Sequence, residues 1–187
     1  MVAAAILACT LALAAGSGPD LSTPLDRIAF RVRATNPRAQ EWIRTGATAS
    51  RTFRSLLNRL GDSDVIVYLE IVDRIAGGAA GQMYFVAATG GMRYLRIEVV
   101  ADPDAARMLA LVGHELQHAV EVADAPHVRD SQSLGMLYRG MFDNALGAPH
   151  HDSVAARLTE QRVKTEIEGC RGPAASPGNR TFAAVQK

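Results

Sequence analysis

Two histidines and a glutamate are spaced as a metal centre requires, in the segment Gly113-His-Glu-Leu-Gln-His118. If this segment is helical, His114 and His118 lie one turn apart on the same face. A tetrahedral zinc ion accepts two such imidazoles at about 2.0–2.1 Å. Glu115 is offset by roughly 100° around the helix axis, where it can reach water at the metal rather than the metal itself. The pattern therefore predicts a zinc site in which Glu115 is the general base.

The same five residues also fit a simpler interpretation, an amphipathic core helix with two surface histidines and a solvated glutamate. The surrounding sequence favours the metal site. Apart from Glu115, the positions between and near the histidines, Val112, Leu116, Gln117 and Ala119, are uncharged, and no proline interrupts residues 108–120. The chain has five histidines, and two of them fall at ligand spacing.

The run from Met108 to Val120 resembles the extended motif of the zincin metallopeptidases. It is also similar to a group of small, mostly uncharacterised secreted bacterial proteins with the sequence His-Glu-Leu-Gln-His. This resemblance spans about residues 60–165 and is specific only around the motif. It implies a Zn²⁺-dependent peptidase that hydrolyses a peptide or protein substrate with metal-activated water.

The resemblance also implies a fold class, an α+β zincin-like single domain. Its parts would be an N-terminal helix, a small antiparallel sheet, the HExxH active-site helix and C-terminal helices. In zincins the strand before the active-site helix commonly pairs with an extended substrate, and residues 92–100 are the candidate here.

A catalytic zinc site usually has three protein ligands, so a third one is expected. Metzincins place a glycine three residues after the second histidine and a ligand three residues further on, but these positions hold Glu121 and Asp124. Glu121 is too far along a straight helix to share the ion, although it can orient His118 through a hydrogen bond. His127 could fold back only through a loop that Pro126 stiffens.

Gluzincins take the third ligand from an acidic residue on a later helix. The similar bacterial proteins carry Phe-Glu-Thr where this chain has Phe142-Asp143-Asn144, so Asp143 is the favoured ligand and Glu160 the runner-up. Asp143 could equally be a helix cap, and Glu160 could lie on a solvated helix face.

An oxyanion stabiliser is also expected, and the sequence does not rank its four candidates. They are Tyr138, His127, His150 and His151. The competing functional class is a non-catalytic zincin-like binding protein, or a metal-binding protein of the cell envelope. Glu115 favours the enzyme, because a structural metal site has no use for a general base.

The elements that must position these residues can be predicted from periodicity and end signals. Asp102-Pro103-Asp104 predicts the start of the motif helix at about 103–123, and Pro126 predicts its end. The expected elements before it are a helix over 37–60 that breaks near Thr45-Gly46, and strands over 65–72, 82–87 and 92–100, the last two joined by a hairpin at Gly90-Gly91. Helices are expected over 131–139 and from about residue 152. Residues 28–33 fit either a first strand or an extended arm.

Three parts are expected along the chain. Residues 1–15 resemble a secretory signal peptide, with an uncleaved anchor or a lipoprotein box at Cys9 as alternatives, so the protein is expected to be secreted or periplasmic. Residues 16–170 are expected to form one domain and residues 171–187 a flexible tail. Any membrane association is expected through the N-terminal segment only.

The composition restricts the classes of ligand and the disulfide bonds that can be expected. A formal net charge of +1 argues against nucleic acid as a ligand. With Cys9 in the leader, Cys170 is the only remaining thiol, so the domain is expected to contain no internal disulfide.

Overall fold

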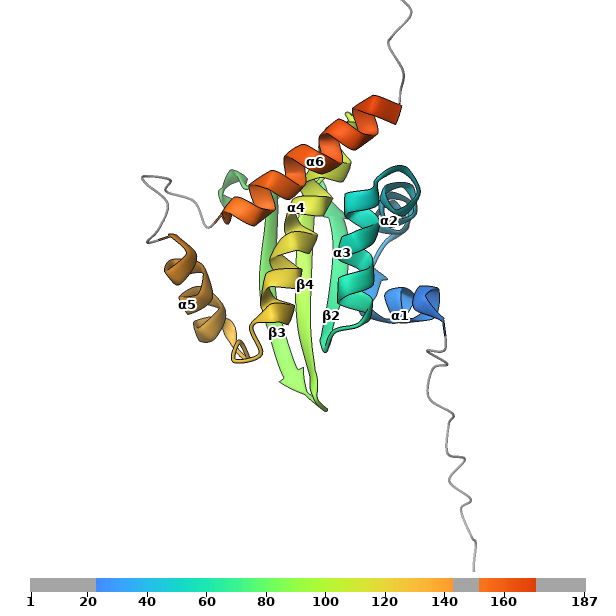
Figure 1. Cartoon of the computed structure of the whole chain (residues 1–187). Helices are drawn as coiled ribbons and strands as arrows, with labels where there is room; N and C mark the ends of the chain where they lie inside the picture. The colour runs from blue at the N-terminus through green and yellow to red at the C-terminus, as the bar shows by residue number, and fades with distance from the viewer. Residues whose placement is uncertain (1–22, 143–151, 171–187) are drawn as a thin grey trace, which may run out of the picture.

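A computed structural model describes residues 23–142 and 152–170 of the chain, so the predicted signal peptide and tail lie outside it. Its elements form a mixed sheet with helices packed on one face (Figure 1). In chain order they are α1 (Pro24–Arg31), β1 (Val32–Ala34), α2 (Pro37–Ala49), α3 (Arg51–Gly61), β2 (Val65–Val72), the short 3₁₀ helix η1 (Ala76–Gly78), β3 (Gly81–Thr89), β4 (Met92–Val100), α4 (Ala105–Asp124), α5 (Ser131–Phe142) and α6 (Val154–Cys170). No helix among the described residues is long and apolar enough to cross a membrane.

The sheet has the strand order β1-β2-β4-β3, and only β3 runs antiparallel to its neighbour. The α+β class is confirmed, but the expectation of an antiparallel sheet is wrong for the pairs β1/β2 and β2/β4. The hairpin sends β3 to the outer edge, so β4 returns beside β2 in the same direction. The described edge strand next to the later helices is therefore β3.

The strand β4 alternates between two environments, as the polar and apolar alternation of residues 92–100 indicates. Its inward residues, such as Leu95 and Ile97, are fully buried under the helices. On the outward face Arg96 pairs across to Glu70 at 2.8 Å. A central strand in a sheet covered on one face has the same polar and apolar alternation as an edge strand.

The hairpin between β3 and β4 is confirmed. Gly90 and Gly91 both have positive φ, at 58° and 75°, which is the requirement of a tight type I′ turn. The turn pairs Thr89 with Met92, and a bulge between Phe85 and Ala87 then shifts the register by one residue, so that Gly81 pairs with Val99 at the far end of the hairpin.

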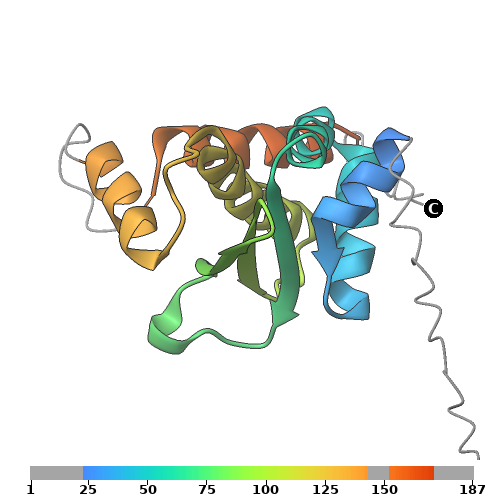
Figure 2. The same ribbon diagram turned by 90° about the horizontal axis from the view of Figure 1, so that it is seen from below.

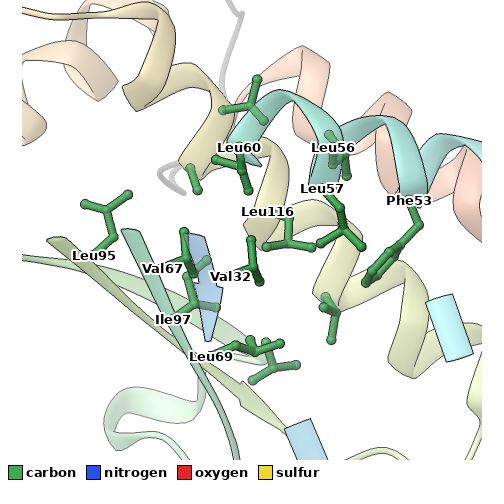
Figure 3. Close-up of a cluster of buried hydrophobic side chains, with 14 of the residues drawn as sticks. Val32, Phe53, Leu56, Leu57, Leu60, Val67, Leu69, Leu95, Ile97 and Leu116 are labelled. Atoms are coloured by element: carbon green, nitrogen blue, oxygen red, sulfur yellow. The ribbon is translucent and has the colours of Figure 1, made fainter. Parts of the chain in front are cut away.

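The core lies between the sheet and the helices α3 and α4 (Figure 3). Leu116, which lies between His114 and His118 in the motif, is completely buried and packs into this hydrophobic core. The labelled members are Val32, Phe53, Leu56, Leu57, Leu60, Val67, Leu69, Leu95, Ile97 and Leu116. One face of α4 is therefore held against the sheet, which leaves an adjacent face to carry the histidines.

Two helix starts differ from the prediction. Residues 28–31 belong to α1 rather than to a strand or an arm, because Thr23 and Asp26 form a capping box around Pro24. The helix α4 begins after Asp104, whose Oδ1 accepts from the Ala106 amide at 2.8 Å, and not after Asp102. The predicted break in the 37–60 helix is present but lies at Ser50, which caps α3 through its hydroxyl.

The C-terminal end of α4 is tied to the sheet by Arg93, a side chain that is 1% exposed. Its guanidinium donates to the carbonyl oxygens of Val122 at 2.6 Å and Ala125 at 2.8 Å, and it also pairs with Asp64. Orphan carbonyls at a helix end are stabilised by a cation placed there. The sheet thus fixes the position of the helix that carries the motif.

Candidate metal centre

His114 and His118 present their Nε2 atoms to each other from one face of α4. These atoms lie 3.2 Å apart, and the two rings meet edge to face with centroids 4.9 Å apart. Two nitrogens that are each about 2.05 Å from a tetrahedral zinc ion would be separated by roughly 3.3 Å. The predicted pair is therefore spaced as two ligands of one ion.

A third donor comes from Asp152, which stands just before α6. Its Oδ1 atom lies 3.3 Å from Nε2 of His114. The ligand atoms of His114, His118 and Asp152 all lie within 4.8 Å of one another. Within the described part of the chain, this is the group of metal-ligating side chains that could hold an ion.

Sequence reasoning missed Asp152, which was taken only as the approximate start of the last helix. The favoured third ligand, Asp143, lies outside the described residues, so it stays a prediction. The runner-up, Glu160, contacts His114 on the opposite side of the ring, at Nδ1, and not at the donor cluster. The available signal was weak: Asp152 precedes Ser153, and an acidic residue before a helix start is common for reasons of capping alone.

Each histidine has a carboxylate on its outer nitrogen. Nδ1 of His114 lies 3.0 Å from Glu160, and Nδ1 of His118 lies 2.8 Å from Glu121. The predicted contact between Glu121 and His118 is thus present. Ionised carboxylates only accept hydrogen bonds, so in the neutral form of each ring Nδ1 is the protonated nitrogen and Nε2 carries the lone pair.

These tautomers make the cluster suited to a cation. When both rings are neutral, two nitrogen lone pairs face each other at 3.2 Å, and a carboxylate oxygen lies 3.3 Å from one of the nitrogens. Oδ1 of Asp152 is buried and makes no hydrogen bond within the described structure. A cation between the three atoms would satisfy all of them at once, and two nitrogens with one oxygen form a donor set that zinc accepts.

The charges around His114 favour its protonated form when no metal is present. Burial lowers the pKa of its imidazole, but the hydrogen bond to Glu160 and the charges of Glu115 and Asp152 outweigh burial, so the pKa is raised. The same hydrogen bond lowers the pKa of Glu160, which keeps that carboxylate ionised beside the ring.

Glu115 lies beside the donor atoms and belongs to none of the three ligand positions. It is only 7% exposed, and burial raises the pKa of its carboxyl group. The backbone of Gly81, at the start of β3, passes directly against it. A Cβ atom at Gly81 would lie 2.8 Å from Cδ of Glu115, so glycine leaves the space that the carboxylate uses.

A cavity of about 730 Å³ contains this group of side chains. Its walls come from α4, from the start of β3, from η1 and the segment that follows it, from α5, from Asp152 just before α6, and from Glu160 within α6. In Figure 1, α6 crosses α4 on one side and α5 stands apart on the other; Figure 2 shows the same separation of α5 from below. The three donor residues and Glu115 all line this cavity, so a molecule that enters it would reach the donor atoms.

Of the four candidates for oxyanion stabiliser, Tyr138 lines this cavity. Its ring meets His118 edge to face with centroids 5.2 Å apart, and burial raises the pKa of its hydroxyl. His127 is exposed and is not part of the cavity wall. His150 and His151 lie outside the described residues.

A larger cavity of about 1000 Å³ lies between α1, α2 and α3. Its charged lining residues are Arg33, Arg44 and Arg54, and no histidine, cysteine or carboxylate lines it. It offers no metal ligands, so the smaller cavity is the candidate site.

Comparisons with known proteins provide no relative: no protein-family model, no curated protein and no solved structure matches the chain. The functional conclusion therefore depends on the residues and geometry of the site.

Proposed function

We propose that the protein is a zinc-dependent peptidase whose metal ligands are His114, His118 and Asp152. One observation carries the proposal: three donor atoms lie within 4.8 Å of one another, with two of their separations at 3.2 and 3.3 Å, while a buried glutamate outside this donor group lies beside them. A purely structural zinc site is usually closed by four protein ligands, whereas a catalytic one has three and an open position.

When bound in such a site, zinc polarises a carbonyl group and lowers the pKa of a coordinated water to about 7. Glu115 would accept a proton from water at its carboxylate and pass it to the leaving amine. Glu160 and Glu121 would hold the two imidazoles in the tautomer that ligation needs. Tyr138 would donate a hydrogen bond from its hydroxyl to the oxygen that becomes negative in the transition state.

The edge strand β3 is the proposed binding surface for the peptide. Residues 92–100 were expected to take this role, but β4 is paired on both sides, with β2 and with β3. The outer edge of β3 has no partner strand within the described structure, and Gly81, Gln82 and Met83 line the cavity. An extended peptide that adds to this edge would run past the metal cluster.

This arrangement also supports a finer proposal for the fold class, namely that the domain is a zincin. The supporting observations are the order of helix, sheet, motif helix and later helices, together with the antiparallel edge strand at the site. The apolar N-terminal segment supports the accompanying proposal of a secreted or periplasmic protein, which cell fractionation with an antibody would test.

Elemental analysis combined with a peptide-library assay tests the proposal. The purified protein should hold about one zinc ion per chain, and His114→Ala should lose it. Glu115→Gln should retain zinc but lose peptide cleavage by a factor on the order of 100 or more, because only the base is removed. Zinc with no cleavage of any peptide, in wild type and variant alike, would favour the non-catalytic binding protein instead. Absence of any bound metal would refute the peptidase.

A further inference from the structure

We propose that Ser153 is a positioning residue for the metal centre, acting through Glu121 to fix Asp152 relative to His118. The inference rests on the proposed metal site and extends it to a residue that touches neither metal nor substrate. It starts from the contacts of one buried carboxylate that joins α4 to α6.

Both oxygens of Glu121 are used. Oε2 accepts from Nδ1 of His118 at 2.8 Å, and Oε1 accepts a hydrogen bond from the hydroxyl of Ser153. Glu121 is 8% exposed and Ser153 is 6% exposed, so water competes little for either bond. The carboxylate therefore connects one metal ligand, His118, to the first turn of another helix.

Ser153 has a second task at the same place. Its Oγ accepts from the amide of Ala156 at 2.9 Å, which caps the N-terminal end of α6. One hydroxyl thus binds both the start of α6 and the carboxylate of α4. Displacing it would move the backbone at the exact point where the third ligand is attached.

Asp152 depends on that anchor because it is the adjacent residue, with a Cα atom about 3.8 Å away. Its Oδ1 has no hydrogen bond within the described structure, and its contact with Arg157 is long, at 3.9 Å. The side chain is therefore placed mainly by its backbone, which Ser153 holds. Loss of the serine hydroxyl should loosen Asp152 without removing any ligand.

The chain contains a closely matched control. Ser50 is also buried, also caps a helix through its Oγ, which accepts from Phe53 at 3.0 Å, and also donates to a glutamate, Glu166, at 2.5 Å. Ser50 connects the start of α3 to α6 and is not part of the cavity wall. Ser50→Ala therefore removes the same chemistry at a place without metal ligands.

The experiment measures zinc affinity by competition with a chromophoric chelator, together with the visible spectrum of the Co²⁺ form, which reports coordination. Ser153→Ala should weaken zinc binding about 10- to 100-fold and change the Co²⁺ spectrum, as loss of an outer partner of a ligand does. Ser153→Thr keeps the hydroxyl and should restore both. Ser50→Ala should lower the unfolding temperature but leave zinc affinity and the spectrum unchanged.

A double variant separates the two routes by which Ser153 could act. In an Asp152→Ala background, Ser153→Ala should cause no further loss of zinc affinity. An equally large loss in that background would overturn the proposal, since the serine would then act on His118 alone. Unchanged affinity in Ser153→Ala, with wild type binding zinc, would overturn it too and leave the peptidase proposal intact. Wild type that binds zinc but cleaves nothing would overturn only the peptidase.

Discussion

Asp152 stands just before α6 and His114 lies in the middle of α4, yet Oδ1 of the aspartate is 3.3 Å from Nε2 of the histidine. This contact brings the beginning of α6 to the middle of α4. It also completes a donor set that the motif alone leaves at two ligands, so it decides which acidic residue should matter for metal binding.

The first prediction concerns the third ligand. Asp152→Ala should weaken zinc binding by more than about 100-fold, because a lost ligand costs more than the 10- to 100-fold typical of its outer partners. Competition titration against a chelator measures it. Asp143→Ala is the comparison, and it should bind zinc as wild type does. The opposite pattern, with Asp143 essential and Asp152 dispensable, would restore the ligand assignment that the sequence favoured.

The second prediction concerns Glu160, whose contact with Nδ1 of His114 is 3.0 Å long. Glu160→Gln removes the charge but keeps an accepting oxygen, so zinc affinity should fall only about 10-fold. Nitrogen NMR of labelled histidine in the metal-free protein, at a pH high enough that the ring is neutral, should show the Nδ1–H tautomer of His114 in wild type and a mixture in Glu160→Ala. Glu168→Gln is the control on the same helix, since Glu168 is exposed and faces Lys164. A total loss of zinc in Glu160→Gln would instead indicate that Glu160 is a ligand.

The sequence predicted the parts of the site that are local in the chain. His114, Glu115, His118 and Glu121 lie on one helix, whose 3.6-residue period determines which side chains share a face. Contacts within one helix, such as the one from Glu121 to His118, follow from that period directly. The start of α1 could also have been predicted, because Thr23-Pro24 and Asp26 form a recognisable capping box.

The parts that depend on contacts between distant segments could not be predicted in the same way. Nothing local distinguishes Asp152 from any acidic residue before a helix, and only the crossing of α6 over α4 gives it a role. Strand order has the same origin. The alternation in residues 92–100 shows that one face is buried, but not whether both edges are paired.

The third prediction concerns Gly81, which faces Glu115 at the start of β3. Gly81→Ala would place a Cβ atom 2.8 Å from Cδ and 2.9 Å from Cγ of Glu115, so the carboxylate must move. Peptide cleavage should fall at least 10-fold while zinc affinity changes little, since the ligands are untouched. A steady-state assay and a zinc titration on the same samples measure the two effects.

A double-mutant cycle provides the control for Gly81. In the metal-free protein that retains Glu115, Gly81→Ala should lower the free energy of unfolding by about 1–3 kcal/mol, as overpacking does. In the Glu115→Ala background, which opens the space, the same change should lower the free energy of unfolding only slightly. Equal costs in the two backgrounds would mean that the two residues do not interact.

The fourth prediction concerns the buried Arg93, which holds the end of α4. Arg93→Met should lower the free energy of unfolding by about 3 kcal/mol, because it leaves Asp64 and several carbonyl oxygens without their cation. Zinc affinity should fall by a smaller factor than in Asp152→Ala, since no ligand is removed. Chemical denaturation of the metal-free protein measures the stability. A variant as stable as wild type would show that these bonds merely replace bonds to water.

The last prediction concerns Asp64, the ion-pair partner of Arg93. The hydrogen bond from Arg93 lowers the pKa of Asp64 in the folded protein, so the folded value lies below the unfolded value of about 3.9. The stabilisation is therefore complete above about pH 5 and is lost as the pH falls through the folded pKa. Asp64→Asn should be less stable than wild type at pH 7, and the gap should shrink toward about pH 2.

The measurement is urea unfolding of the metal-free protein at both pH values, so that acid release of zinc does not contribute. Asp62→Asn serves as the control, because Asp62 pairs with Arg27 at an exposed position, where an ion pair contributes little. A gap between wild type and Asp64→Asn that stays constant with pH would mean that the charge of Asp64 is not what stabilises the end of α4. The role of Arg93 would then reduce to its bonds with the carbonyl oxygens of α4 and the turn that follows it.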